Sequence, residues 1–264
     1  MRDMGKSDQP RAPWSGKQTG RKRAIAESGT ALAIIDTIHS GGLSAAGTGW
    51  GGARNRADRT SEYLTRRQCE GLIAAAARAQ RMGLPFNRHW TIHYERAGVA
   101  EIDAGRFIGR LLKLAGDYAR RHHGKIAAIW VRENGDGKGG HVHILLHLPA
   151  GLGLRGRTAH WVRLAGGERS ARVSRVRSIG RGLTSADNGG EHYQQNAGAV
   201  LAYILKGADA ETGATLGLTR HGERGLIIGK RCGRTQNIGQ LLESDQLTHQ
   251  LKPPSPRPNN AKMD

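Results

Sequence analysis

Apolar and polar positions along the middle of this chain repeat with two periods, which predict helices and strands. A stripe of apolar residues at helical spacing follows Asp103, and residues 192–206 carry a second stripe. Both segments are therefore expected to be amphipathic helices. Thr65 and Gln68 match a capping box and predict a helix over 65–82. Short alternating or continuously apolar runs, typical of strands, occupy residues 88–95, 126–132 and 141–148.

The order of the predicted elements indicates the fold class. A leading helix is followed by strand, helix, strand, strand and helix, and residues 225–229 predict one more short strand. Asn134-Gly135 and Gly139-Gly140 are pairs typical of a hairpin, so the strands beside them should be antiparallel neighbours. We therefore expect an α+β fold in which an antiparallel sheet carries helices packed on one face.

Composition along the chain predicts its domain organisation. Residues 1–60 are basic and Gly-rich and are expected to form a disordered extension. Residues 61–210 are expected to form the folded domain, led by the helix at 65–82. Residues 211–252 form a C-terminal extension to which no role can be assigned, and the Pro- and Asn-containing residues 253–264 are expected to be a disordered tail.

Charge and composition indicate the kind of partner and the compartment. The chain has 41 Lys and Arg against 22 Asp and Glu, a net charge of +19. A fold does not need so large an excess, so a polyanion such as nucleic acid is the expected partner. No apolar run approaches the roughly 18 residues of a membrane span, so no membrane contact is expected. Two cysteines, Cys69 and Cys232, and a polar N-terminus favour a reducing, cytoplasmic setting.

The strand at 141–148 carries the pattern of a metal site. His141 and His143 flank Val142, so both imidazoles project from one face of the strand, about 7 Å apart along the chain. Glu133 closes the preceding strand, and a hairpin would bring it beside the histidines. Two histidines and one carboxylate leave coordination positions open, which is typical of a metal site that takes part in chemistry.

A second candidate for chemistry lies on the helix at 192–206. Tyr203 and Lys206 are three residues apart and share a helical face. A tyrosine hydroxyl can attack a phosphate when a metal polarises that phosphate and a cation stabilises the phenolate. Lys206 is a candidate for that cation, and Tyr193 is a rival candidate for the nucleophile.

Between residues 150 and 182 the chain has eight arginines and one acid, Glu168. This imbalance predicts a surface that binds nucleic-acid phosphates. The candidate DNA-binding residues are Arg155, Arg157, Arg172, Arg175 and Arg177.

Three motifs in this order resemble the HUH endonucleases, in particular the single-tyrosine rolling-circle replication initiator (Rep) proteins of plasmids and phages. HWTIHYE at 89–95 is similar to the family's first strand motif, HVH at 141–143 to its metal motif and AYILK at 202–206 to its nucleophile motif. The resemblance covers about residues 86–207. It implies a ferredoxin-like or RNA-recognition-like sheet, with Glu133, His141 and His143 as ligands of Mg²⁺ or Mn²⁺.

The resemblance also implies an activity and partners. Tyr203 would attack a phosphate of a single-stranded or hairpin DNA origin, forming a 5′-phosphotyrosyl link and releasing a 3′-OH. A host helicase and a host polymerase would then extend the freed strand in rolling-circle replication.

Other interpretations remain open. A relaxase or a transposase would use the same chemistry. Gly135, His141 and His143 also fit the glycine-to-histidine spacing of a cupin metal motif, although the expected glutamate after them is missing and the flanks are helical. A non-catalytic basic DNA-binding protein would need only the charge. The segment RGLIIGKRCG at 224–233 has no assignable role.

Overall fold

A computed structural model describes residues 58–239 of the chain, apart from residues 136, 171, 181–190, 221, 223 and 224. The predicted disordered extension covers residues 1–60, and its residues 1–57 lie outside the described residues, as does the predicted disordered tail, residues 253–264. The helices are α2 (Arg66–Arg81), α3 (Ala104–Arg121), α4 (Thr158–Leu164), α5 (Glu191–Leu205) and α6 (Ala210–Thr215). The strands are β1 (Thr60–Ser61), β2 (Arg88–Ile92), β3 (Ala127–Gly135), β4 (Gly139–His147), β5 (Ser174–Ser178), β6 (Ile227–Ile228) and β7 (Cys232–Arg234).

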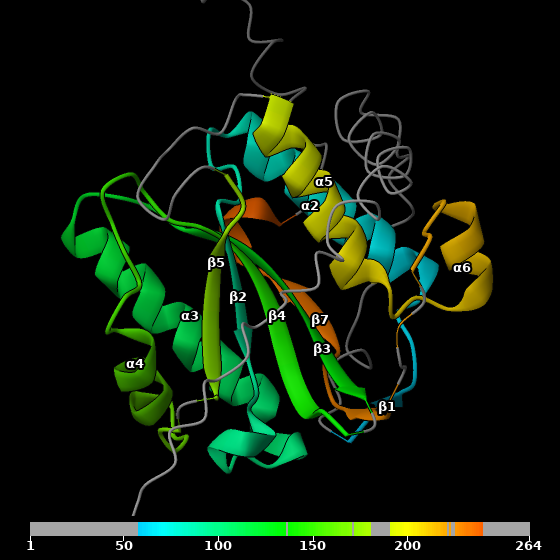
Figure 1. Ribbon diagram of the computed structural model, residues 1–264, viewed down its shortest axis with the longest axis horizontal. Helices are drawn as coiled ribbons and strands as arrows, with labels where there is room; N and C mark the ends of the chain where they lie inside the picture. Colours follow the sequence, from blue (N-terminus) through cyan, green and yellow to red (C-terminus); the bar gives the residue numbers. More distant parts are fainter. Residues whose placement is uncertain are drawn as a thin grey trace, which may run out of the picture.

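The strands form a five-stranded antiparallel sheet in the order β5-β2-β4-β3-β7 and a two-stranded sheet of β1 and β6 (Figure 1). The hairpin predicted at Asn134-Gly135 and Gly139-Gly140 is present, since β3 pairs with β4 from Ala127↔His147 to Gly135↔Gly139. This α+β architecture confirms the predicted fold class. It differs from the all-β double sheet of a cupin.

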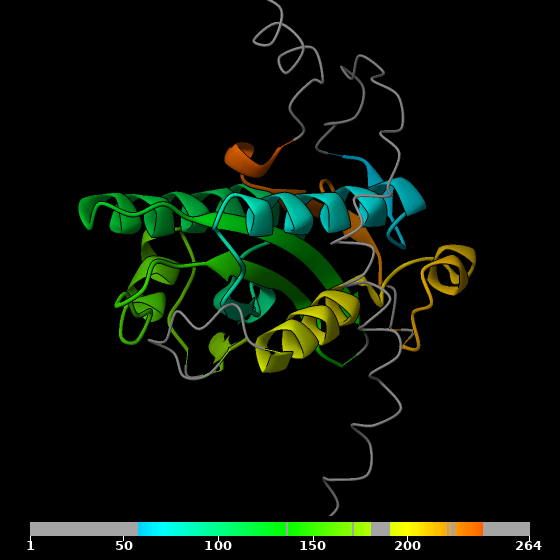
Figure 2. The ribbon, with the colours of Figure 1, turned by 90° about the horizontal axis from the view of Figure 1, so that it is seen from above.

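Helices pack on both faces of the sheet, whereas one covered face was expected. Trp90, Ile92 and Ile144 point to the face that α3 and α4 cover, while Ile129 and Leu145 point to the face that α2 and α5 cover. Figure 2 shows α3 and α5 on opposite sides of the strands. The physical reason is visible in β3 and β4, which are almost fully buried on both faces and so need cover on both.

Local signals in the sequence set several element boundaries. Thr65 caps α2 as predicted: its backbone N–H donates to Gln68 Oε1 at 2.9 Å, and its side chain accepts from the Gln68 N–H at 3.4 Å. Asp103 precedes α3 but makes no side-chain capping bond. The predicted strand over 88–95 is shorter, because β2 ends at Ile92 and a 3-10 turn begins at Glu95.

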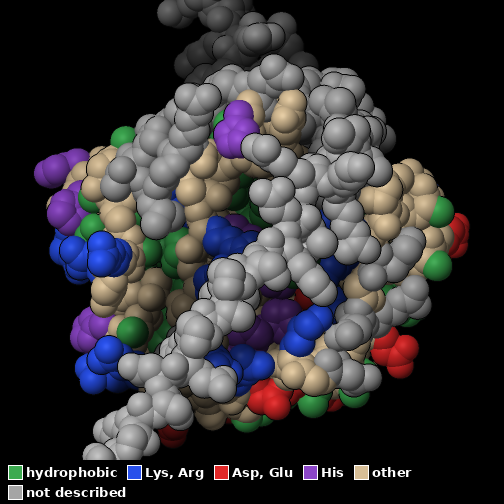
Figure 3. All heavy atoms as spheres, in the orientation of Figure 1, with side chains coloured by type: hydrophobic (Ala, Val, Ile, Leu, Met, Phe, Trp, Pro, Cys, Tyr) green, Lys and Arg blue, Asp and Glu red, His purple; other side chains and the backbone are tan. Residues whose placement is uncertain are grey.

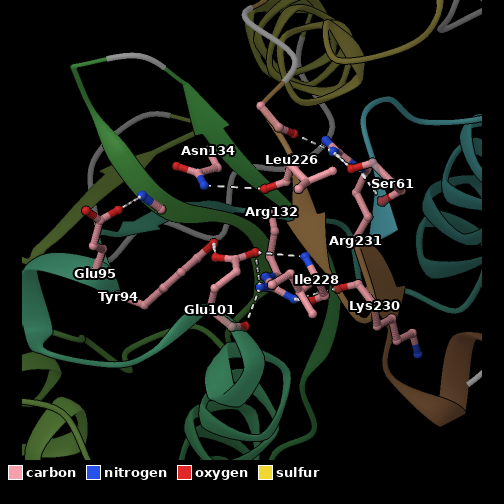
Figure 4. A network of polar contacts seen from close by, with 12 residues as sticks. Ser61, Tyr94, Glu95, Glu101, Arg132, Asn134, Leu226, Ile228, Lys230 and Arg231 are labelled. Atoms are coloured by element: carbon pink, nitrogen blue, oxygen red, sulfur yellow. Dashed lines mark hydrogen bonds and ion pairs between the residues drawn. The ribbon is translucent and has the colours of Figure 1, made fainter. Parts of the chain in front are cut away.

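The described part of the C-terminal extension completes the sheet. β7 pairs with β3 through Val131↔Cys232. The guanidinium of Arg132 donates to the backbone oxygens of Ile228 at 2.9 Å and Lys230 at 3.1 Å, and it is ion-paired with Glu101 (Figure 4). The described residues 225–233 of the RGLIIGKRCG segment therefore have a structural role, because they hold the end of β3 in place.

In the described ranges, none of the helices combines the length and the apolar character that crossing a bilayer requires.

Candidate metal centre and active-site cavity

The pairing of β3 with β4 assembles a three-residue candidate metal centre. Glu133 lies directly opposite His141, and His143 lies opposite Val131. The Nε2 atoms of His141 and His143 lie 3.4 Å and 3.7 Å from Glu133 Oε2. One ligand atom from each residue lies within 4.8 Å of the other two. The residues predicted from the H-x-H spacing and the hairpin are therefore brought together as a group that could hold a metal.

The chemistry of the three side chains fits a divalent cation. All three are buried, with exposed fractions of 4–5%. His141 Nδ1 lies 2.9 Å from the carbonyl oxygen of Gly139. If Nδ1 carries the proton, the lone pair of His141 is on Nε2, toward Glu133. Among the described residues His143 Nε2 has no hydrogen-bond partner. A buried acceptor without a donor is costly, and a bound cation would satisfy it.

Lys206, the residue directly after α5, reaches the same centre. Its Nζ is ion-paired with Glu133 Oε1. Burial alone would raise the pKa of Glu133, but the adjacent imidazoles of His141 and His143 and the positive charge of Lys206 hold that pKa well below its ordinary value. Glu133 is therefore a carboxylate at neutral pH. The sequence suggested a role for Lys206 beside Tyr203, and the contact with Glu133 was not predicted.

Tyr203 lies beside the candidate metal centre. Its ring centroid is 5.2 Å from that of His143 and 6.0 Å from that of His89, both in edge-on geometry. Lys206 Nζ lies 4.4 Å from the centre of the same ring. Burial and the negative charge of Glu133 raise the pKa of Tyr203, so the resting side chain is a neutral phenol.

An open cavity of about 750 Å³ joins these groups. His141, His143 and Tyr203 line it, together with strand residues of β2 and β5 and the segment 218–220. Lysine and arginine side chains surround the histidines at its centre (Figure 3). The basic lining residues are Arg96, Lys138, Arg172, Arg175, Arg177 and Arg220. Such a cavity is suited to an anionic ligand.

The cavity separates the five predicted DNA-binding arginines into two groups. Arg172, Arg175 and Arg177 line it. Arg155 and Arg157 are not among its described lining residues, and Arg157 lies over the ring of Tyr118 at 4.1 Å. Tyr118 belongs to the core under α3, on the other face of the sheet. The charge excess along the chain could not show this division. It arises because α4 lies between Arg157 and Arg172 in the chain, and β5 places Arg175 and Arg177 at the cavity.

Tyr193, the rival nucleophile, occupies a different environment. Its hydroxyl donates to the carbonyl oxygen of Phe86 at 2.9 Å, and its side chain is buried between α5 and α2. Burial raises its pKa.

The structure adds three cavity residues that were not predicted as site residues: His89, Thr91 and His93. They occupy every second position of β2 and the residue after it, so their side chains point to one face of the sheet. This alternation within the HWTIHYE motif is the sequence signal that could have identified them. Burial and neighbouring positive charges lower the pKa of His89 to about 3, so its imidazole is neutral.

Comparisons with protein-family models, with curated proteins and with solved structures find no match to this chain.

Proposed function

We propose that this protein is a metal-dependent endonuclease and strand transferase for single-stranded DNA, with Tyr203 as the nucleophile. The observation that carries the proposal is the placement of Tyr203 against His143 in a cavity that is also lined by His141 of the candidate metal centre and by several arginines. Each part alone has an ordinary structural explanation. Together they supply a nucleophile, a Lewis-acid site and phosphate-binding cations for one reaction.

Glu133, His141 and His143 would hold Mg²⁺ or Mn²⁺, and that ion would supply Lewis-acid polarisation of a non-bridging phosphate oxygen. Tyr203 Oη would form a bond to phosphorus as the bond from phosphorus to the 3′ oxygen breaks. The phenol proton would pass to solvent water and the departing 3′ oxygen would take one up from water, so no net proton is gained or lost. The products are a 5′-phosphotyrosyl link and a free 3′-OH, and the reverse transfer rejoins the strand.

The basic side chains of the cavity would hold the DNA backbone. Arg175 and Arg177 lie on the edge strand β5, opposite Thr91 and His89 of β2. They line the same cavity as His141 and His143, with β2 between β5 and β4, where phosphates next to the scissile one could bind. Their contribution would be sensitive to salt, as is general for phosphate contacts.

The proposed biological role is to nick an origin and so initiate rolling-circle replication, with a host helicase and polymerase extending the 3′-OH. The support is the order of the three motifs and the basic charge of the chain. A relaxase or a transposase would use the same cavity, and the DNA substrate would distinguish these roles.

The direct test is to incubate the protein with single-stranded and hairpin oligonucleotides in Mn²⁺ or Mg²⁺, denature it and map any DNA-linked residue. A DNA adduct on Tyr203 supports the proposal. Absence of an adduct with all substrates, together with tight DNA binding, would instead support a non-catalytic DNA-binding protein.

A further inference from the structure

The HWTIHYE motif at 89–95 has a two-sided arrangement. Trp90, Ile92 and Tyr94 are fully buried in the core that α3 and α4 cover. The residues between them, His89, Thr91 and His93, line the cavity on the other face. The core residues explain why this segment forms a central strand, but they do not explain why a histidine, a threonine and a histidine lie on the opposite face.

Two of these residues contact a predicted metal ligand. His143 Nδ1 lies 3.0 Å from Thr91 Oγ1 and 3.1 Å from His89 Nε2. Both partners come from β2, where Thr91 is the direct cross-strand neighbour of His143. The Thr91 oxygen can accept a hydrogen bond while its own O–H points to an unprotonated His89 Nε2, 3.5 Å away. In that arrangement Thr91 and His89 favour the tautomer of His143 in which Nδ1 carries the proton.

That tautomer is the one a metal ligand needs here. Nε2 of His143 lies on the Glu133 side, 3.7 Å from Oε2. With the proton on Nδ1, Nε2 keeps its lone pair for an ion. With the proton on Nε2, the imidazole would instead donate toward Glu133, and the ligand atom would be blocked.

The two ligand histidines are held by different kinds of acceptor. His141 Nδ1 faces the carbonyl oxygen of Gly139, which is backbone and is unaffected by changes on β2. The turn that places this carbonyl is fixed in part by Glu95, whose carboxylate accepts from the Gly140 N–H. His141 is therefore an internal control for any experiment that removes the acceptors of His143.

We propose that Thr91 and His89 are positioning residues for the candidate metal centre: they accept from the Nδ1–H of His143 and so keep its Nε2 lone pair available to the ion. This inference rests on the metal site of the proposed function, but it does not depend on DNA cleavage. It assigns His89 and Thr91, on the cavity side of HWTIHYE, to metal binding, whereas the alternate residues of the motif belong to the core.

The experiment compares the wild-type chain, Thr91→Val, Thr91→Ser and the double variant Thr91→Val/His89→Leu. Valine matches the shape of threonine without its hydroxyl, whereas serine keeps the hydroxyl and is the matched control. Long-range ¹H–¹⁵N correlation spectra of metal-free protein at neutral pH report the tautomer of each histidine, with His141→Gln and His143→Gln used to assign the signals. Mn²⁺ affinity is then measured by calorimetry on the same proteins.

We expect His143 of the wild type and of Thr91→Ser to carry its proton on Nδ1. In the double variant its Nε2–H form should appear while His141 keeps its tautomer. Mn²⁺ affinity should fall by about 10–100-fold in the double variant, the usual effect of losing a partner of a ligand histidine. Thr91→Val alone should lie between these values.

Three results would overturn the inference: an unchanged His143 tautomer in the double variant, unchanged Mn²⁺ affinity, or equal changes at His141 and His143. Absence of Mn²⁺ binding by the wild type would also overturn it. A wild-type protein that binds Mn²⁺ with the expected tautomer dependence, yet forms no DNA adduct, would contradict the proposed endonuclease and leave this inference supported.

Discussion

Lys206 Nζ is ion-paired with Glu133 Oε1, although the two residues are 73 positions apart in the chain. The pair connects α5, which carries Tyr203, to β3, which carries the carboxylate of the candidate metal centre. It also leaves Oε2 of Glu133 facing His141 and His143. Glu133 therefore pairs one carboxylate oxygen with Lys206, and its other oxygen is placed where it could bind a metal.

This relationship predicts that Lys206→Met destabilises the metal-free protein. Glu133 would become a buried carboxylate without its lysine partner, and removing one member of a buried ion pair typically costs about 3–5 kcal/mol. Mn²⁺ should restore part of the lost stability, because the bound ion can balance the negative charge of Glu133 in place of Lys206. Thermal unfolding in EDTA and in Mn²⁺ measures both effects.

The control for that experiment is Glu133→Gln/Lys206→Met, which removes both charges. It should be more stable than Lys206→Met alone and should gain little from Mn²⁺. If Mn²⁺ stabilises the wild type and Lys206→Met by the same amount, Lys206 and the ion do not share the Glu133 charge.

Removing the ligand histidines should separate metal binding from DNA binding. We expect His141→Ala/His143→Ala to lose Mn²⁺ binding and DNA cleavage, because only Glu133 would remain of the three ligands. Binding of single-stranded DNA should persist, since the arginines of β5 and its neighbourhood are unchanged. Calorimetry, a nicking assay and filter binding give the three readouts. Cleavage at the wild-type rate in EDTA would show that the triad is not the catalytic metal site.

The division of the arginines predicts different effects on short DNA. Arg172→Ala/Arg175→Ala/Arg177→Ala should weaken binding of a short single strand and reduce the slope of log K against log salt by about 0.7 for each phosphate that an arginine no longer neutralises. Arg155→Ala/Arg157→Ala should leave that slope unchanged, because neither residue is among the described lining residues of the cavity. Equal decreases in both variants would indicate that all five arginines form one DNA-binding surface.

Short-range signals in the sequence predicted much of this fold and the grouping of the three candidate metal ligands. The capping box at Thr65 and the glycine pairs beside Glu133 and His141 act through neighbouring atoms, so local pattern was enough. Lys206 reaches Glu133 only because α5 packs across β3, and no local spacing encodes that contact. Similarly, the strand β5 and the helix α4 were not predicted, because they lie in an arginine-rich segment whose many charged residues obscure the periodic spacing of its apolar residues.

Identifying the nucleophile is the most decisive test of the proposed function, because Tyr193 and Tyr203 lie on the same helix in different environments. Tyr203 lines the cavity beside His143, whereas the hydroxyl of Tyr193 is bound to the carbonyl oxygen of Phe86. Tyr203→Phe keeps the ring and its packing and removes only the attacking oxygen. We therefore expect it to fold, bind Mn²⁺ and bind DNA, yet form no denaturant-resistant adduct with a single-stranded oligonucleotide.

Tyr193→Phe is the matched control and should keep the adduct, although losing its buried hydrogen bond should lower stability by about 1 kcal/mol. Gel mobility after denaturation and peptide mapping distinguish the two variants. Since phenylalanine cannot attack phosphorus, an adduct that survives in Tyr203→Phe at the wild-type level would require another nucleophile. If only Tyr193→Phe lost the adduct, Tyr193 would be the nucleophile, and it lies at the other end of α5, away from Glu133, His141 and His143. The candidate metal centre would then need a different explanation.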